Sequence, residues 1–349
     1  AAAAVPLPRR GRLERSIQEV FTMPNNITSF DIGESQVKVV TLSGGSVKKA
    51  VALELPDYVV SGGTVLSMDA LADFLKEKLR ASGPIKKDAA VILPDSLVFC
   101  RNITVPPMTD AQLNYNLPFE FKDYLNQEKS RYYFDYAVQG TEKDESGETT
   151  GLRLFACATL KKTVEDYRAM FYRAGYKLKL ALPEEAAFGN LAALHAKNAP
   201  GDEDLCIVDI GHKGIRMFIY RDGHFRTHRA VDLGLWDLEQ QLASERGVDP
   251  HMAHTHLLTD YESALTQDST LELFNRMAVE IMKAVNFYNY NNREQSLRSV
   301  YLCGGGAAIA PLRETVSRVT DLELKDIGTL IPGDVETPWL FARAAGCGL

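Results

Sequence analysis

An internal duplication constrains the fold of this chain more than any other feature. The stretch "DIGESQVKVV" begins at Asp31 and "DIGHKGIRMF" begins at Asp209, which places the copies 209 − 31 = 178 residues apart. Both copies share Asp-Ile-Gly, then a β-branched residue and a cation at matched positions, and both continue into a Gly-Gly or Asp-Gly pair. Such pairs favour two-residue hairpins, so each copy is predicted to form a strand, a turn and a strand. The shared register indicates two related halves in one chain.

Length and composition are consistent with two globular lobes. The chain has 349 residues, of which 45% are apolar, and this is enough for two hydrophobic cores. A formal net charge of -7 with well-mixed signs gives no basic field for nucleic acid, so we expect no nucleic-acid partner. The five cysteines are far apart and odd in number, which favours a reducing compartment over a disulfide framework.

The sequence carries no pattern of membrane insertion. No apolar run approaches the length of about 18 residues that a spanning helix needs. The start "AAAAVPLPRRGR" places its arginines after the short apolar piece, which reverses the order of a secretory signal. We therefore expect a cytoplasmic protein that reaches a membrane only through partners, with residues 1–26 as an arm or leader outside the core.

Periodicity predicts the remaining elements. Helical spacing covers 66–79, and the region 96–176 alternates strands and helices as a compact α+β insert that includes the helical stretch "TDAQLNYNLPFEFKDYL" and the polar loop "TEKDESGETTG". A helix from Pro183 through His195 precedes the second copy, 234–292 is mainly helical, and "PWLFARAAG" is a final helix. The predicted units are a first lobe of 27–95 and 177–200, the insert 96–176, a second-lobe core of 201–235 and 296–349, and a helical part 236–295.

The two hairpin tips are predicted to grip a chain of phosphates. Free backbone N–H groups at a tip form a concave anion site, and two related tips facing each other could hold phosphates from both sides. Asp31 and Asp209 would then lie where a hydrated Mg²⁺ takes one or two carboxylates beside phosphate oxygens. The tip residues predicted to bind the ligand are Gly33, Glu34, Ser35 and Gln36 in the first copy and Gly211, His212, Lys213 and Gly214 in the second.

Further residues are candidates for the rest of a nucleotide. Lys38 is favoured over Arg216 for phosphate, since Lys is the commoner point charge for it, although both could instead pair across their sheets. Glu280 and Lys283 share a helix face suited to sugar hydroxyls and an adenine edge, or form an exposed ion pair. The glycines between a strand and a helix, which allow close approach of a ring or ribose, are Gly304, Gly305 and Gly306.

Three other patterns have ordinary structural explanations. The pattern H-x-x-H-x-H at His251, His254 and His256 is compatible with zinc, but a solvated helix start is favoured. Phe287, Tyr288 and Tyr290 have helical spacing, which favours core and rim over a partner surface. The cysteines read as small buried apolar residues, since no histidine stands in a pairing motif with them.

The chain resembles the actin-like ATPase superfamily. The resemblance rests on three features in this order along the sequence: the duplicated hairpins, the helix with Glu280 and Lys283, and "LCGGGAAIAPL". Over 27–349 the motifs "VILPDSLVFCRNITVPPM", "FDYAV", "YRAMFYRAGYKL" and "AVDLG" are similar to the PilM family of type IV pilus assembly, relatives of the division protein FtsA. The resemblance implies an α/β actin-like (ribonuclease H-like) fold with two lobes around a nucleotide cleft and an FtsA-type insert. It also implies ATP and Mg²⁺ in the cleft.

The resemblance implies partners as well as ligands. We expect a cytoplasmic scaffold at the inner-membrane platform of a type IV pilus, or of related type II secretion, that docks the N-terminal tail of a PilN-type bitopic protein. Other platform proteins and self-association are further expected contacts. The alternatives are an FtsA-like filament-forming ATPase, a degenerate scaffold without nucleotide, and, from the enzyme class, a sugar or acid kinase.

Catalysis is expected to be weak at most. The family commonly has Glu-Pro at the start of the linking helix, where the glutamate is a candidate for orienting the attacking water, and this chain has Leu182-Pro183. Glu184 and Glu185 are the substitutes, although one residue along a helix turns the side chain by about 100°. In the second tip, His212 to Ile215 stand where the family has small hydroxyl residues. Both departures predict a nucleotide binder with little turnover.

Overall fold

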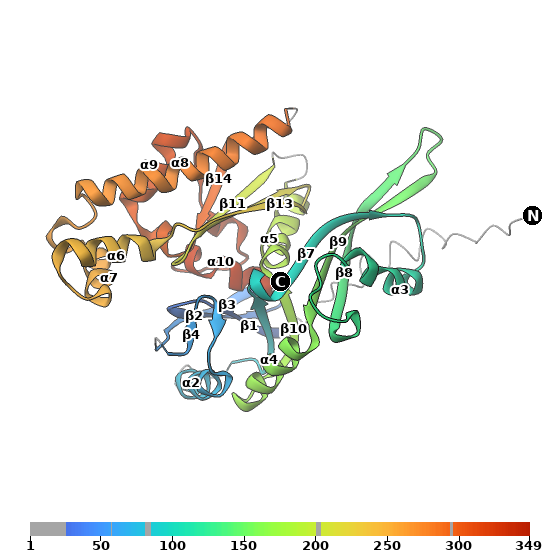
Figure 1. Ribbon diagram of the computed structural model, residues 1–349, viewed down its shortest axis with the longest axis horizontal. Helices are drawn as coiled ribbons and strands as arrows, with labels where there is room; N and C mark the ends of the chain where they lie inside the picture. Colours follow the sequence, from blue (N-terminus) through green and yellow to red (C-terminus); the bar gives the residue numbers. More distant parts are fainter. Residues whose placement is uncertain (1–25, 57, 81–84, 200–203, 294–295) are drawn as a thin grey trace, which may run out of the picture.

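The structure is a computed structural model that describes residues 26–56, 58–80, 85–199, 204–293 and 296–349. Two five-stranded sheets with a pair of helices between them make up the body of the molecule, and a three-stranded sheet stands out to one side (Figure 1). The arm predicted at 1–26 falls, apart from its last residue, outside the described residues.

The two large sheets have the same topology. Their strand orders are β3-β2-β1-β6-β10 and β13-β12-β11-β14-β15, so each has an antiparallel three-stranded meander followed by two parallel strands. The duplication seen in the sequence is therefore a duplication of a whole sheet. The strands are β1 (Asn26–Ile32), β2 (Gln36–Ser43), β3 (Ser46–Glu54), β6 (Asp88–Leu93), β10 (Lys177–Pro183), β11 (Leu205–Ile210), β12 (Ile215–Arg221), β13 (His224–Val231), β14 (Ser299–Cys303) and β15 (Glu323–Lys325).

The predicted hairpins are confirmed in both copies. Asp31 lies opposite Lys38 in the β1–β2 pair, and Asp209 lies opposite Arg216 in the β11–β12 pair. The second turns are the expected two-residue loops: Gly44-Gly45 links β2 to β3 and Asp222-Gly223 links β12 to β13. All four turn residues have positive φ, the conformation that these two loops require.

Two helices, α5 (Glu184–Asn198) and α10 (Pro338–Cys347), lie between the large sheets. One hydrophobic core unites them with the inner face of each sheet, including Ile27 and Ile92 from the first and Ile207 from the second. Neighbouring strand residues point the other way, because side chains alternate across a strand. The central strands are therefore buried on both faces.

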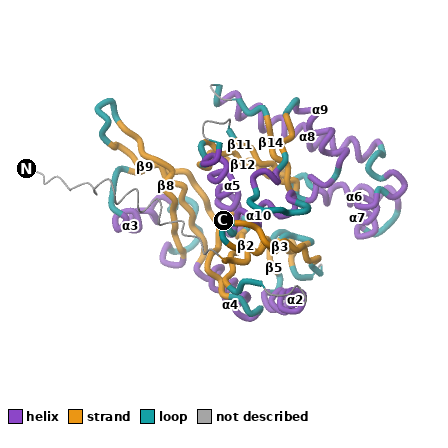
Figure 2. The backbone as a smooth tube through the Cα atoms, turned by 180° about the vertical axis from the view of Figure 1, so that it is seen from behind, coloured by secondary structure: helices purple, strands orange, loops and turns teal. Residues whose placement is uncertain are grey.

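The outer faces of the sheets are covered by helices that differ between the lobes. The first sheet carries α2 and α4, and the second carries α6, α7, α8 and α9. Figure 2 shows the larger helical layer from behind, with α6 and α7 at the far end of the molecule from the insert. These helices are α2 (Met68–Arg80), α4 (Lys161–Arg173), α6 (Leu235–Arg246), α7 (Pro250–Thr259), α8 (Asp268–Asn291) and α9 (Ala310–Thr320).

The insert is a three-stranded sheet of order β7-β9-β8 with α3 packed on one face. Two details differ from the sequence prediction. The segment predicted as a polar loop is mostly hairpin, because β8 and β9 continue into it and pair as far as Lys143 and Thr149. The predicted helix is shorter than expected and ends two residues after Pro118. The elements are β7 (Val98–Val105), α3 (Asp110–Glu120), β8 (Tyr132–Lys143) and β9 (Thr149–Leu160).

Within the described ranges, no helix combines the length and apolar character needed to cross a bilayer.

Short elements connect the layers described above. The remaining elements are β4 (Val60–Ser61), β5 (Thr64–Val65) and the 3-10 turns η1 (Asp95–Leu97), η2 (Lys129–Arg131), η3 (Tyr261–Ser263), η4 (Gly305–Ala308) and η5 (Ile327–Leu330).

Because α5 and α10 are in close contact, a methyl group added at Gly346 should destabilise the fold. A Cβ atom added at Gly346 of α10 would collide with the backbone carbonyl of Ala187 in α5. Both helices are fixed between two sheets, so we expect Gly346→Ala to lower the free energy of unfolding by about 1–3 kcal/mol. Urea denaturation followed by circular dichroism measures this change.

Gly189→Ala is the matched control on the facing helix. Its added Cβ would meet only the ring of Tyr220, at an ordinary 3.4 Å. Replacing a glycine inside a helix by alanine stabilises it by about 0.5–1 kcal/mol, so this variant should be neutral or more stable. Equal stability of both variants would show that α5 and α10 do not pack as described.

Candidate functional site

Both duplicated aspartates, Asp31 and Asp209, point into the layer between the two large sheets, as the alternation of side chains along a strand requires. Ile27 points into the core around α5 and α10, whereas Phe30 points into the outer core. Asp31 lies four residues after Ile27 and therefore shares its face. In the same way, Asp209 shares the face of Ile207. Both carboxylates thus point from the ends of their strands towards α10.

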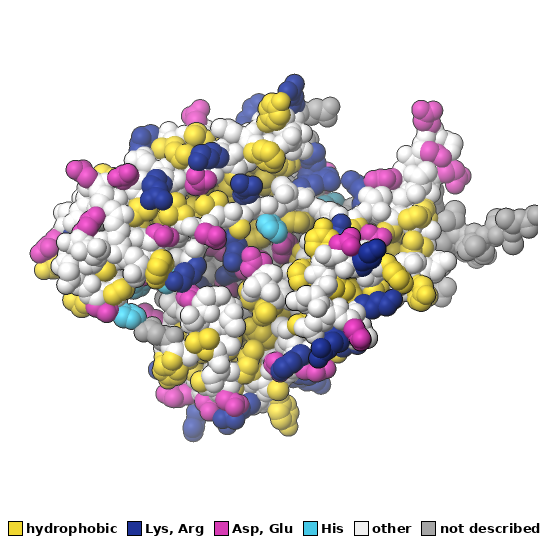
Figure 3. All heavy atoms as spheres, viewed as in Figure 1, with side chains coloured by type: hydrophobic (Ala, Val, Ile, Leu, Met, Phe, Trp, Pro, Cys, Tyr) yellow, Lys and Arg dark blue, Asp and Glu magenta, His cyan; other side chains and the backbone are white. Residues whose placement is uncertain are grey.

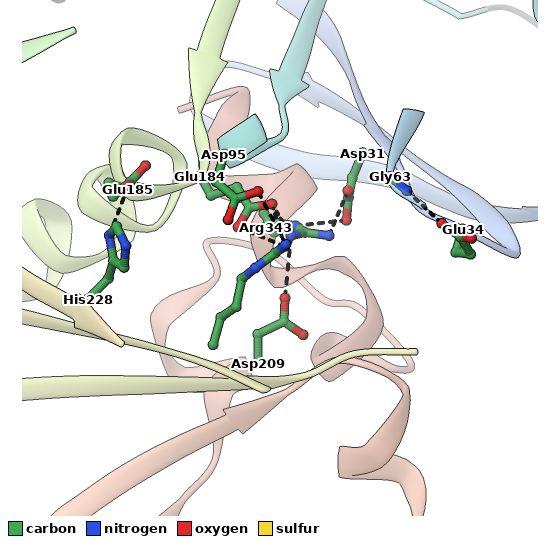
Figure 4. A network of polar contacts seen from close by, with 10 residues as sticks. Asp31, Glu34, Gly63, Asp95, Glu184, Glu185, Asp209, His228 and Arg343 are labelled. Atoms are coloured by element: carbon green, nitrogen blue, oxygen red, sulfur yellow. Dashed lines mark hydrogen bonds and ion pairs between the residues drawn. The ribbon is translucent and has the colours of Figure 1, made fainter. Parts of the chain in front are cut away.

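Arg343 of α10 lies between these two aspartates (Figure 4). Its Nη2 and Nε donate to the two carboxylate oxygens of Asp31 at 2.9 and 3.2 Å. Its Nη1 donates to Oε1 of Glu184 at 2.9 Å and lies 3.5 Å from Oδ2 of Asp209. One guanidinium therefore joins the first sheet, the start of α5 and the second sheet.

A second arginine extends this cluster. Nη1 of Arg216, on β12, lies 2.9 and 3.2 Å from the two carboxylate oxygens of Glu184, and its Nη2 reaches Asp95 at 3.4 Å. We call the group of Asp31, Asp95, Glu184, Asp209, Arg216 and Arg343 the cleft ion cluster. Arg216 is thus bound to protein carboxylates, and the choice of Lys38 for phosphate stays a prediction.

Burial sets the electrostatics of this cluster. Burial opposes the charge on Arg343, but Asp31, Glu184 and Asp209 hold its pKa well above the usual value, so it stays protonated. Burial raises the pKa of Glu184 to about 7, against the attraction of Arg343 and Arg216. For Glu184, the loss of hydration therefore outweighs the attraction of the two arginines. Such a cluster fixes the relative positions of its members rather than adding net stability.

The predicted Mg²⁺ position does not fit this arrangement. The ion was expected between Asp31 and Asp209, where the guanidinium of Arg343 lies. Among the residues that the structure describes, no group of three or more His, Cys, Asp or Glu side chains is arranged to hold a metal ion. The carboxylates of Asp31, Glu184 and Asp209 bind the guanidinium of Arg343 instead of a metal ion.

The structure brings the two hairpin tips together across one cavity. The loops 33–36 and 211–214 have matching closures, with the amide of Gly33 bonded to the Gln36 carbonyl and that of Gly211 bonded to the Gly214 carbonyl, both at 2.9 Å. Residues of both tips line a cavity of about 400 Å³. Its lining from the tips consists of Glu34, Ser35, Gln36, His212 and Lys213.

The side chains at these tips are bound to neighbouring protein groups. The carboxylate of Glu34 accepts from the backbone amides of Gly62 and Gly63 at 2.8 and 2.9 Å. His212 is paired with Glu239 at 3.0 Å, and Lys213 lies over the ring of Trp236. A phosphate at the tips would therefore rely on backbone amides and Lys38 rather than on these side chains.

Glu280 and Lys283 line a second cavity, of about 570 Å³. They are paired with each other at 2.7 Å, as the ordinary alternative predicted, and Lys283 remains 63% exposed. The cavity lies between α8 and the loop that starts at Val231, and its volume suits a nucleoside-sized ligand.

The three glycines have a packing role in this structure. Gly304 has φ of +82°, and a Cβ there would meet Asp209 and the carbonyl of Ile210. A Cβ on Gly306 would meet the side chain of Ile210, and one on Gly305 would meet Leu235. Packing therefore excludes a side chain at all three positions, and their predicted role in binding a ring or ribose stays a prediction.

The two candidate catalytic glutamates point to different partners. Glu184 belongs to the cleft ion cluster, whereas Glu185 pairs with His228 of β13 at 3.0 Å (Figure 4). Both are only 4% exposed. The hydrogen bond that His228 donates to Glu185 raises the pKa of His228. As placed here, Glu184 is bound to two arginines and Glu185 to a histidine.

Sequence reasoning missed Arg343 and Asp95. Arg343 is the single charged residue in the apolar stretch "PWLFARAAG", and a cation within a buried helix needs carboxylate partners. That signal was present in the sequence. Asp95, which follows Pro94 in a 3-10 turn, carries no comparable signal.

Two histidines, His212 and His254, pair with the same side chain, that of Glu239. His254 contacts Oε1 of Glu239 at 2.8 Å, and His212 contacts Oε2 of the same side chain. His256 instead stacks on Tyr261. Although burial opposes it, the bonds from His212 and His254 lower the pKa of Glu239 to about 2. His256 is buried and His254 is bound to Glu239, so the predicted solvated helix start does not describe these two residues.

Fold and site together define a two-lobed actin-like protein whose cleft lies at the ends of the duplicated strands. A solved PilM-PilN type IV pilus biogenesis complex is similar at 21% identity over 92% of this chain and 97% of that one, with a TM-score of 0.76. The ethanolamine utilization protein EutJ from Carboxydothermus hydrogenoformans is similar at 15% identity over 93% and 90%, with a TM-score of 0.59. No curated protein matches the sequence.

The family is established by sequence as well. A family model described as type IV pilus assembly protein PilM matches residues 29–327. This chain belongs to that family. The predicted actin-like fold and the family resemblance are both confirmed.

The Glu239 cluster predicts a pH dependence of stability. The hydrogen bond to Glu239 raises the pKa of His254 above its unfolded value of 6.5, so its stabilisation is complete below pH 6.5 and is lost as the pH rises through the folded pKa. Because His254 is 42% exposed, we expect only about 0.5 kcal/mol. Urea titrations of wild type and His254→Gln across this range should show the difference disappearing at alkaline pH.

His224→Gln provides a comparison of opposite sign. Burial lowers the pKa of His224, so the wild-type residue destabilises the fold as the pH falls below 6.5. The difference between wild type and this variant should therefore grow in favour of wild type with rising pH. Parallel slopes for the two variants would refute the assigned contacts.

Proposed function

We propose that this chain is a cytoplasmic scaffold of type IV pilus assembly that docks the N-terminal tail of a PilN-type inner-membrane protein. Family membership over residues 29–327 carries this proposal. It is supported by the likeness of nearly the whole chain to the protein in a solved PilM-PilN complex. The protein would then be held at the inner membrane by its partner.

The insert offers a surface for docking. Hydrophobic side chains gather around α3 on the face shown in Figure 3. Tyr115, Phe119 and Tyr124 are 73%, 49% and 48% exposed, and we call them the insert patch. Lys129 lies over the ring of Phe119 and Arg101 over that of Tyr124. Exposed aromatic residues with nearby cations are typical of protein-binding surfaces.

ATP is the proposed ligand of the cavity beside Glu280 and Lys283. The cavity volume of about 570 Å³ and the paired charges at its rim favour a nucleoside with hydroxyl groups. The arginine between Asp31 and Asp209 favours the second candidate, a scaffold without nucleotide. Filament formation is a further possibility that sedimentation in the presence of ATP tests.

Tail docking predicts a measurable affinity that depends on the insert patch. A fluorescent peptide of the N-terminal tail from the PilN-type protein of the same genome should bind saturably in an anisotropy titration. Exposed aromatic anchors often dominate such contacts, so Tyr115→Ser combined with Phe119→Ser should weaken binding by about tenfold or more. The absence of binding to wild type would contradict the proposed function.

A double variant on α8 controls for loss of exposed aromatic area. Phe287 and Tyr290 are each 70% exposed at the end of α8 in the other lobe, and changing both to serine removes two rings outside the insert. Tail affinity should be unchanged in this variant. An equal loss in both variants would place the docking surface elsewhere.

ATP binding is tested by thermal shift with EDTA present. If ATP occupies the cavity, millimolar ATP should raise the unfolding temperature of wild type, and Lys283→Ala should remove that rise. No rise in wild type would favour the scaffold without nucleotide. The tail-binding assay is independent of this result.

A further inference from the structure

We infer that Arg343 is the resident counter-ion of the cleft and takes the place of a divalent cation between Asp31 and Asp209. The cleft would then need no Mg²⁺, and contact between the lobes would not depend on metal. This inference concerns the ions of the cleft and stands apart from tail docking, which is proposed on other residues.

Geometry makes the arginine and a bridging cation alternatives. Mg²⁺ binds oxygen at about 2.0–2.1 Å and requires near-octahedral geometry. Both oxygens of Asp31 already accept from Arg343, at 2.9 and 3.2 Å, and Oδ2 of Asp209 lies 3.5 Å from the same group. An ion that bridged the two carboxylates would need the space that the guanidinium fills.

The arginine is a fixed part of the site. Its helix, α10, is buried on both flanks of Arg343, and Ser29 and Asn190 donate to the carbonyls of Ala344 and Gly346 at 2.5 and 2.9 Å. The side chain of Arg343 is only 14% exposed. Moving it out would break contacts with three carboxylates at once while the helix stayed in place.

Charge within the cleft is largely balanced without metal. The cleft ion cluster has four carboxylates and two arginines, and Lys38 lies opposite Asp31 in the neighbouring strand. Three cations therefore face four carboxylates. Arginine keeps its charge at any physiological pH, so this compensation is permanent.

Binding of Mn²⁺ to the full-length wild-type chain is the first test. Mn²⁺ substitutes for Mg²⁺ at oxygen sites, and free Mn²⁺ is measured by electron paramagnetic resonance. We expect no binding that depends on the cleft, so Asp31→Asn and Asp209→Asn should give the same Mn²⁺ titration as wild type. One Mn²⁺ per chain in wild type that either variant loses would overturn the inference.

Removal of the arginine is the second test. Arg343→Ala leaves Asp31, Glu184 and Asp209 facing one another, so its unfolding temperature in EDTA should be well below that of wild type. MgCl₂ should restore several degrees in a saturable way, while NaCl of equal ionic strength should not. A folded variant that does not respond to MgCl₂ would contradict the replacement of a cation by Arg343.

Arg221→Ala is the matched control. Arg221 forms an ion pair with buried Asp204 at 2.6 Å, outside the cleft. Its loss should also lower the unfolding temperature, but MgCl₂ should have no effect beyond that of NaCl. If Arg343→Ala does not fold, the Mn²⁺ titrations of wild type and the two aspartate variants still decide the question.

Tail binding measured in EDTA and in MgCl₂ separates this inference from the proposed function. Equal tail affinity in both is expected, since the cleft needs no metal. A tail that never binds would refute the docking proposal and leave the Mn²⁺ result standing. A tail that binds only with Mg²⁺, together with cleft-dependent Mn²⁺ binding, would refute the role of Arg343 alone.

Discussion

The ion pairs of Arg343 join both large sheets and the start of α5 at one point, beside the hydrophobic core that the two sheets share. Each sheet has its own outer core, and the two sheets share only the layer of α5 and α10. At the open edge of that layer, one guanidinium contacts the end of β1, the start of α5 and the end of β11. A buried arginine of this kind is retained only where carboxylates from several elements converge on it.

Much of this architecture follows from local patterns in the sequence. The diglycine and Asp-Gly turns fix the registers of β2–β3 and β12–β13. The matching β1–β2 and β11–β12 hairpins place Asp31 and Asp209 at equivalent strand ends. The two-residue period then decides which face each aspartate occupies. The end of β8 and the start of β9 were predicted wrongly as loop, because pairing between these two strands, and not their polar composition, sets their structure.

At the centre of the site, the sequence signals that Arg343 needs carboxylate partners but not which carboxylates they are. Arg343 meets Asp31 across 312 residues and Glu184 across 159, and no local pattern reports contacts of that range. The glycines of 304–306 were assigned to a ligand because their freedom suits one, and in the structure Asp209, Ile210 and Leu235 also lie where their Cβ atoms would be. Sequence patterns predicted the two strand ends that carry Asp31 and Asp209. They did not predict that Arg343, from a distant helix, lies between them.

These features connect the fold to a scaffold role. A scaffold needs a constant arrangement of lobes on which a docking surface is displayed, and the cleft ion cluster provides a fixed link between the lobes. The insert extends from this body with its own core around α3 and exposed rings on its surface. Nucleotide at Glu280 and Lys283, if bound, would contact the second lobe without displacing the link.

The central claim is that Arg343 occupies the cation position between the lobes. A crystal structure of the full chain grown in MnCl₂, with diffraction measured at the manganese absorption edge, tests it most directly. The account predicts Arg343 in contact with Asp31, Glu184 and Asp209, with no anomalous peak between the aspartates. An anomalous peak bound by Asp31 and Asp209, with Arg343 turned away, would contradict it.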